Sequence, residues 1–225
     1  MGTFAVQTFA IAGKDLRLEL RSRERLMSML VFAVLVAVVF SFALDPAVRP
    51  SAVAGAMLWV TILFTGILGL GRSFVLEREQ EALTGLLLAP LDRGALYLGK
   101  LLANLALLIA SEVVIVPVYA LFFQLELGRA LGGVTLVVVL ASIGFMALGT
   151  LFSAISGGTR MGETLLPVLL FPLLLPVVIF AASATQHLLL GRPLAEVAGS
   201  LRMLGAFDIV FLVVCTLLFG SVVEE

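Results

Sequence analysis

Histidine and cysteine are almost absent from this 225-residue chain, which has one of each, His187 and Cys215. A single cysteine cannot form an intrachain disulfide, and a single histidine excludes a metal site built from several histidines. No charge of either sign dominates. Lysine and arginine number 14 and aspartate and glutamate 15, so the net charge of −1 argues against a nucleic-acid partner.

Charged residues make up only 13% of the chain, whereas hydrophobic residues make up 61%. Soluble domains carry about 25% charged residues, and their exterior must face water. A soluble fold of this length cannot bury so much apolar surface. The composition therefore excludes an ordinary soluble domain, a disordered chain and a disulfide scaffold, and it predicts a polytopic membrane protein.

Six apolar runs are each long enough to cross a bilayer, which takes about 20 helical residues. They are residues 26–44, 51–71, 101–123, 130–156, 164–188 and 203–223. Outer-membrane barrel strands are about half that length and alternate in polarity, so the runs predict helices. We expect an all-α, six-span membrane protein that forms one transmembrane domain over residues 1–225.

Lysine and arginine are distributed unevenly between the two sides of these spans. One side carries ten, namely Lys14, Arg17, Arg21, Arg23, Arg25, Arg72, Arg78, Arg93, Lys100 and Arg160, and the other carries four. Cytoplasmic loops hold the excess of such cations. The distribution predicts that both termini are cytoplasmic.

Residues 1–25 mix apolar and basic side chains ahead of the first span. Phe9, Leu16, Leu20 and Met27 fall on one face at helical spacing, which predicts a helix lying along the cytoplasmic membrane surface. The alternative is that these residues are only a basic flank of the first span.

The longest connection, residues 72–100, opens with a dense charge cluster and then turns apolar before Pro90. This pattern predicts a short cytoplasmic helix that docks into a groove of a partner; the alternative is a solvated loop. The candidate docking residues are Glu77, Arg78, Glu79, Glu81, Leu83, Leu86, Leu87 and Pro90.

Gly94, Gly99 and Lys100 match the spacing of a phosphate-binding loop, but Leu101 stands where a magnesium-binding serine or threonine is needed. We therefore expect no nucleotide site in this chain. Instead, Lys100 is expected to reach the membrane interface and Tyr97 to lie at the level of the lipid headgroups.

Glu112 is the one ionisable residue expected deep in the membrane, and Tyr119 shares its helical face. Buried membrane carboxyls are functional candidates by default, so both residues are candidates for a polar cavity, although a packing role is equally compatible. Asp208 is expected near the end of the last span, within reach of water. Four prolines, Pro117, Pro167, Pro172 and Pro176, are candidates for helix kinks, in a moving helix or as static curvature.

Gly128 and Gly132 match the G-x-x-x-G spacing that lets membrane helices approach closely. Helix packing within the chain and an interface with another chain are both compatible with this short motif.

Three segments carry a resemblance to a known family: DLRLELRSRE at residues 15–24, FALDP at 42–46 and LEREQEALTGLLLAPLDRGALYLGKLLAN at 76–104. With these motifs, the length and the six spans, the whole chain resembles the CcmB family of haem exporter membrane subunits.

The resemblance implies a six-helix permease half of the ABC-2 type in the bacterial inner membrane, which serves c-type cytochrome biogenesis. It implies a CcmB homodimer, two copies of a CcmA-like ATPase that uses the ATP, the partners CcmC and CcmD, and the haem chaperone CcmE. It places the coupling helix at residues 77–91. The chain itself is then no enzyme and holds no cofactor directly. Haem is the substrate, or ATP drives release of the haem-loaded chaperone, and the lack of a haem-ligand pair fits the second account better.

Two other functions remain as alternatives. A stand-alone secondary transporter would show paired broken helices or several buried charges, whereas one deep carboxyl is expected here. An intramembrane protease would need a Ser156–His187 dyad, but these two residues are expected on opposite sides of the membrane.

Overall fold

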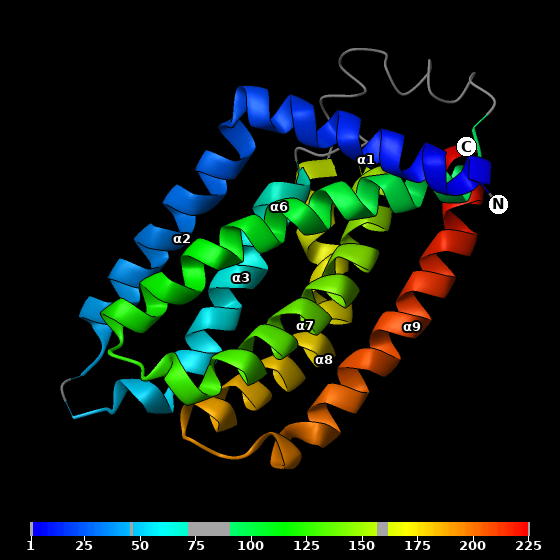
Figure 1. The fold of residues 1–225 in the computed structure, drawn as a ribbon. Coiled ribbons are helices and arrows are strands. Elements are labelled where there is room, and N and C mark those ends of the chain that lie inside the picture. The colour runs from blue at the N-terminus through cyan, green and yellow to red at the C-terminus, as the bar shows by residue number, and fades with distance from the viewer. Residues whose placement is uncertain (1, 46, 72–90, 157–161, 225) are drawn as a thin grey trace.

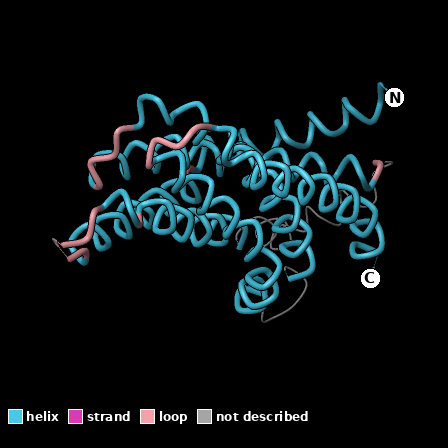
Figure 2. The backbone as a smooth tube through the Cα atoms, turned by 90° about the horizontal axis from the view of Figure 1, so that it is seen from below, coloured by secondary structure: helices cyan, strands magenta, loops and turns pink. Residues whose placement is uncertain are grey.

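The computed structural model describes residues 2–45, 47–71, 91–156 and 162–224, and across these ranges the chain is helical without any strand (Figures 1 and 2). The elements are α1 (Gly2–Ser22), α2 (Glu24–Ala43), the 3₁₀ turn η1 (Pro50–Ala52), α3 (Ala54–Gly71), α6 (Arg93–Phe122), α7 (Leu127–Ser156), α8 (Gly162–Leu189) and α9 (Leu194–Glu224). All the α-helices except α1 are long and apolar enough to cross a membrane, which gives six spans. The predicted fold class is confirmed.

Two helices, α6 and α9, begin well before the expected start of their spans. The loop expected over residues 72–100 ends sooner, because α6 starts at Arg93. Asp92 caps this start, since its Oδ1 accepts hydrogen bonds from the backbone N–H groups of Gly94 (2.8 Å) and Ala95 (3.3 Å). The last helix starts at Leu194 rather than at residue 203. The first turns of α9 include the charged residues Glu196 and Arg202, so they did not form part of the uncharged run from which the span was predicted.

Helix α1 lies across one end of the bundle, beside the start of α6 (Figure 1). Arg23 separates α1 from α2 with a left-handed backbone (φ 58°), which an arginine adopts only rarely. The chain turns sharply there and enters the first span. The helix expected within residues 1–25 is therefore present and ends at Ser22.

Helices α3 and α7 form the centre of the bundle. Trp59 of α3 is buried, and its Nε1 donates a hydrogen bond to Thr185 Oγ1 of α8 at 2.9 Å. The second half of α7, from Ala141 to Ala154, is almost wholly buried. The outer helices α2 and α9 instead expose large apolar side chains, among them Leu35, Val39, Ile209 and Leu217. An apolar exterior around helices whose backbone is internally bonded is what lipid requires.

Candidate functional site

One face of α1 packs against the start of α6. The buried residues on this face are Thr8, Ile11, Ala12 and Glu19. Gly99 of α6 faces these residues. A Cβ added to Gly99 would lie 2.7 Å from Ile11 Cβ and 2.8 Å from the Thr8 carbonyl oxygen. Only glycine permits so close an approach. The two helices therefore form one tightly packed unit.

A buried ion pair joins the same two helices. Lys100 Nζ lies 3.0 Å from Asp15 Oδ2, and the Lys100 side chain is only 2% exposed. A lone buried ammonium would be costly, so Asp15 compensates a charge that the fold removes from water. The expectation that Lys100 reaches the membrane interface was wrong, because α1 covers it.

Tyr97 is also fully buried rather than at headgroup level. Its hydroxyl donates a hydrogen bond to the Ala147 carbonyl of α7 at 2.8 Å, and its ring lies 5.3 Å from that of Phe219 in α9. The early start of α6 explains both errors, since residues 93–100 are part of a packed helix. A sequence signal existed: Asp15 and Glu19 lie four residues apart on one side of α1.

Further hydrogen bonds extend this polar cluster into the bundle. An Arg25 guanidinium nitrogen donates to Asn104 Oδ1 at 2.6 Å, and Asn104 Nδ2 donates to Thr150 Oγ1 at 3.0 Å. Glu19 Oε1 accepts from the backbone N–H of Leu26 at 3.1 Å. These bonds connect α1 with the spans α2, α6 and α7. A displacement of α1 would therefore strain its contacts with all three spans.

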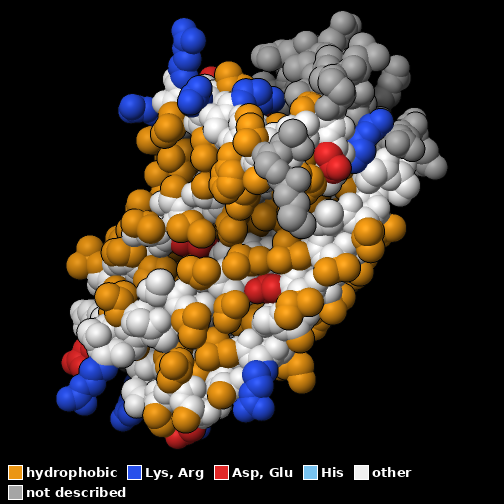
Figure 3. Space-filling model, turned by 45° about the vertical axis from the view of Figure 1, so that its right-hand side comes forward, with side chains coloured by type: hydrophobic (Ala, Val, Ile, Leu, Met, Phe, Trp, Pro, Cys, Tyr) orange, Lys and Arg blue, Asp and Glu red, His pale blue; other side chains and the backbone are white. Residues whose placement is uncertain are grey.

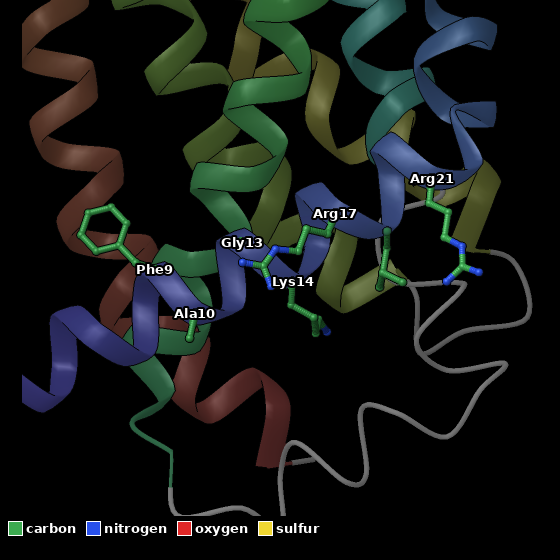
Figure 4. A pocket seen from close by; sticks show the side chains of 7 residues that line it. Phe9, Ala10, Gly13, Lys14, Arg17 and Arg21 are labelled. Carbon is green, nitrogen blue, oxygen red and sulfur yellow. The ribbon is translucent and has the colours of Figure 1, made fainter.

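A basic surface, formed by Lys14, Arg17 and Arg21, lies on the outer side of α1. With Phe9, Ala10, Gly13 and Leu18, these residues line an open pocket of about 480 Å³. Figure 4 shows Lys14 and Arg21 extending away from the packed helices. On the expected apolar face, Phe9 and Leu20 are exposed (69% and 65%). Helix α1 thus has a packed face, a basic face and an exposed apolar face.

The candidate coupling residues belong to the segment that follows α3. Glu77, Arg78, Glu79, Glu81, Leu83, Leu86, Leu87 and Pro90 lie outside the described residues. Their proposed role in coupling stays a prediction.

Glu112 lies in the middle of the bundle and is 2% exposed. Its Oε1 accepts a hydrogen bond from Ser142 Oγ of α7 at 2.7 Å, whereas its Oε2 has no hydrogen-bond partner within the described ranges. Glu112 borders a largely apolar cavity of about 220 Å³ between α6 and α7. An uncompensated polar atom in such a place costs free energy unless a ligand or partner satisfies it.

Tyr119 does not border this cavity. It is 1% exposed, its hydroxyl is hydrogen bonded to Thr61 Oγ1 and donates to the Met57 carbonyl, both on α3, and its ring stacks on Phe123. It fastens α6 to α3. Glu112 and Tyr119 are therefore not brought together.

Asp208 is a second buried carboxyl that the sequence interpretation misplaced. Because α9 begins at Leu194, Asp208 lies in the middle of that helix rather than near its end. It is 6% exposed and packs against Gly144, whose added Cβ would lie 2.6 Å from Asp208 Oδ1. Neither carboxyl oxygen has a hydrogen-bond partner in the described part of the chain.

Glu112 and Asp208 flank α7 at similar depth, because their neighbours Ser142 and Gly144 are only two residues apart. Two residues of helix correspond to about 3 Å. Figure 3 shows acidic side chains within an otherwise apolar face. The middle of the bundle thus holds two carboxyls rather than the single one expected.

The candidate kink prolines all lie inside continuous helices. Pro117 is in α6, and Pro167, Pro172 and Pro176 are in α8. Each proline removes one helical N–H donor and leaves a carbonyl four residues earlier without its usual partner. Three such positions within α8 weaken its backbone ladder.

Ser156 and His187 lie at opposite ends of antiparallel helices, near the last residues of α7 and α8. The 28 residues of α8 extend between these two ends, which corresponds to roughly 40 Å. This geometry excludes a Ser156–His187 dyad within the chain. Among the described residues, no three His, Cys, Asp or Glu side chains are grouped for a metal ion.

A family model and several known proteins are similar to almost the whole of this chain. The family model described as "CcmB protein" matches residues 6–225. "Heme exporter protein B" of Rhodobacter capsulatus is 30% identical over 195 residues, which cover 84% of this chain and 89% of that protein. Proteins of the same name from Paracoccus denitrificans (30% identical; 79% and 82% covered) and Escherichia coli K12 (28% identical; 85% and 86% covered) also match.

Proposed function

The chain belongs to the CcmB protein family, and from that premise we propose that it is the permease subunit of a haem export system in c-type cytochrome biogenesis. The observation that carries the proposal is a family match over almost the whole chain, together with six membrane-spanning helices. Its relatives are named heme exporter protein B. The permease moves in response to ATP hydrolysed by a separate CcmA-like ATPase.

The proposed assembly contains two copies of this chain and two ATPase subunits. CcmC, CcmD and the haem chaperone CcmE are the further proposed partners, in the bacterial inner membrane. The basic residues of α1 and the start of α6 support a cytoplasmic position for this end of the bundle, by the positive-inside rule. Both termini are then cytoplasmic, on the side of the ATPase.

Motion of the ATPase enters the membrane domain at this cytoplasmic end. Because Gly99 and the Asp15–Lys100 pair join α1 to α6, a force on α1 moves α6 with it as a rigid unit. Packed helices respond to such a force by shifting or rocking as whole elements. Closure of the ATPase dimer then rocks the two permease halves against each other.

Two cargoes are compatible with this motion: haem itself, or the haem-loaded chaperone at the outer surface. The chain contains a single histidine, His187, so it offers no pair of histidine ligands for haem. This supports chaperone release as the ATP-driven step.

Co-purification in detergent with the CcmA-like ATPase tests the proposal. Glu77→Ala and Glu81→Ala, in the candidate coupling segment, are expected to lower ATPase stimulation severalfold while the membrane domain stays folded. Glu126→Ala is the matched control, because Glu126 is exposed between α6 and α7 at the other end of the bundle. A purified chain that binds no ATPase would contradict the proposal.

A stand-alone secondary transporter is the second candidate function. The two buried carboxyls, Glu112 and Asp208, favour it more than the sequence did. Transport by the purified chain in vesicles without ATPase would establish this alternative, whereas transport that requires the ATPase and ATP would eliminate it.

A further inference from the structure

A groove between α6 and α7 opens on the outer surface of the bundle. It has a volume of about 220 Å³, and its lining is apolar except for Glu112 and Thr135. Val113, Leu131 and Val139 at its border are exposed by 67%, 50% and 36%. The groove therefore faces whatever surrounds the protein in the membrane.

Glu112 lines this groove, and one of its carboxyl oxygens has no hydrogen-bond partner among the described residues. Oε1 is satisfied by Ser142, but Oε2 is buried without a partner among the described residues. Lipid tails offer no hydrogen bond, and little water reaches this depth. Free energy is therefore gained by an occupant that brings a polar group to Oε2.

Beside the groove, α7 allows another helix to approach closely. Gly128 and Gly132 are exposed, and an added Cβ on either would meet nothing within 4 Å. They form the G-x-x-x-G motif, and no helix of the described bundle covers it. Small residues of this kind let two membrane helices come into backbone contact.

We infer that the groove between α6 and α7 binds a membrane-spanning helix of a partner protein, which donates a hydrogen bond from a polar side chain at mid-membrane depth to Glu112. The partner helix packs on Gly128 and Gly132, and its apolar side chains fill the groove. A serine, threonine, asparagine or basic side chain supplies the donor. The interaction needs neither ATP nor the coupling segment.

A second copy of this chain fits the groove poorly. Copies in one membrane share an orientation, so a two-fold contact through this face would place equal depths opposite each other. Thr135, the exposed donor on this face, is seven residues from Ser142, hence about 10 Å from the depth of Glu112. At its own depth, Glu112 would meet the other Glu112 and apolar neighbours.

The test uses the purified full chain in lipid nanodiscs and two synthetic membrane-spanning peptides. One is a helix of about 20 leucines with a central asparagine, and the other has leucine throughout. The asparagine peptide, measured by energy transfer to a dye on the chain, is expected to bind about 3- to 20-fold more tightly. Its central position keeps the donor at mid-membrane in either orientation.

Variants separate the hydrogen bond from general packing. Glu112→Leu is expected to abolish the difference between the peptides. Glu112→Gln should retain much of it, because the asparagine carbonyl of the peptide can accept from the glutamine amide. Gly132→Leu is expected to weaken both peptides, and Gly205→Leu neither, since Gly205 is an open glycine of α9 away from the groove. Equal binding of the two peptides to the unmodified chain would overturn the inference.

Photo-crosslinking from position 135 in native membranes gives a readout that does not depend on Glu112 variants folding. The expected adduct is another polypeptide, crosslinked within a membrane span that has a hydrogen-bond donor near its middle. An adduct with a second copy of this chain, with lipid alone, or with a span lacking any such donor would each overturn the inference.

Discussion

At the scale of single residues, the Asp15–Lys100 pair is a buried ion pair that joins α1 to α6. The Lys100 side chain is 2% exposed and that of Asp15 is 18% exposed, so water screens the pair only partly. We expect Asp15→Asn to lower the free energy of unfolding by about 2–3 kcal/mol, because the buried ammonium then loses the carboxylate charge that lies 3.0 Å away. Unfolding in mixed detergent micelles measures the change.

The Arg192–Glu196 pair provides the matched control. Its N–O distance is 3.5 Å, and both side chains are more than half exposed. Glu196→Gln should change stability by less than about 1 kcal/mol. In the double variant Asp15→Asn/Lys100→Met, part of the loss should be recovered. If Asp15→Asn cost no more than Glu196→Gln, the pair would not fasten α1 to the bundle.

Asp208 gives an opposite prediction, because its buried carboxyl has no hydrogen-bond partner in the described chain. An unpaired buried polar group costs about 1–3 kcal/mol, and the small cavity left by truncation costs about 1 kcal/mol. Asp208→Ala should therefore raise stability by about 1 kcal/mol, measured by thermal unfolding in detergent, while it lowers ATP-driven release of the chaperone. Higher stability with lost activity marks a residue kept for function.

Gly144 tests the same contact from the α7 side. Gly144→Ala should destabilise the chain, since its Cβ would lie 2.6 Å from Asp208 Oδ1. In the Asp208→Ala background the same change should cost much less, which a double-mutant cycle detects as coupling. If the effects of Gly144→Ala and Asp208→Ala on stability were additive, the two residues would not be in steric contact.

At the scale of helices, the packing of α1 on α6 depends on Gly99. A Cβ there would meet Ile11 Cβ at 2.7 Å and the backbone oxygen of Thr8 at 2.8 Å, and backbone cannot move aside cheaply. Gly99→Ala should therefore lower stability by about 1–3 kcal/mol and should also reduce ATPase stimulation. Thermal unfolding and ATPase assays measure the two effects.

Gly205→Ala is the control for Gly99→Ala, because its Cβ would enter open space on α9. It should leave ATPase stimulation unchanged and stabilise the helix slightly. If Gly99→Ala lowered the stability of the chain but left ATPase stimulation unchanged, the contact of α1 with α6 would stabilise the fold without transmitting motion.

The existence of the spans could be predicted because each is an apolar run that needs no tertiary partner to be recognised. Their ends could not, since Asp92 fixes the start of α6 through a cap and α9 begins with polar turns. The positions predicted for Lys100 and Asp208 were wrong for the same reason, because the depth of each residue depends on where its helix begins. Glu112 was identified from its position alone, but its bond to Ser142 and its unpaired oxygen required the packing of α6 on α7.

At the scale of the whole molecule, six spans return the chain to the side on which it began. Figure 1 places both termini near α1, at the end of the bundle that carries Lys14, Arg17 and Arg21. The opposite end carries fewer cations, among them Arg49, Arg129 and Arg192. Chain geometry puts both termini on one side, and the positive charge favours the cytoplasm for that side.

Reporter fusions test this orientation. Green fluorescent protein fused after Glu225 should fluoresce, because it folds in the cytoplasm, and alkaline phosphatase inserted at Gly191 should be active outside it. Gly191 suits the insertion, since it lies in the exposed turn between α8 and α9 with a positive φ of 78°. The reverse pattern would place the basic surface of α1 away from the ATP supply. An ATPase could not then act there, so the coupling proposal depends on this one topological result.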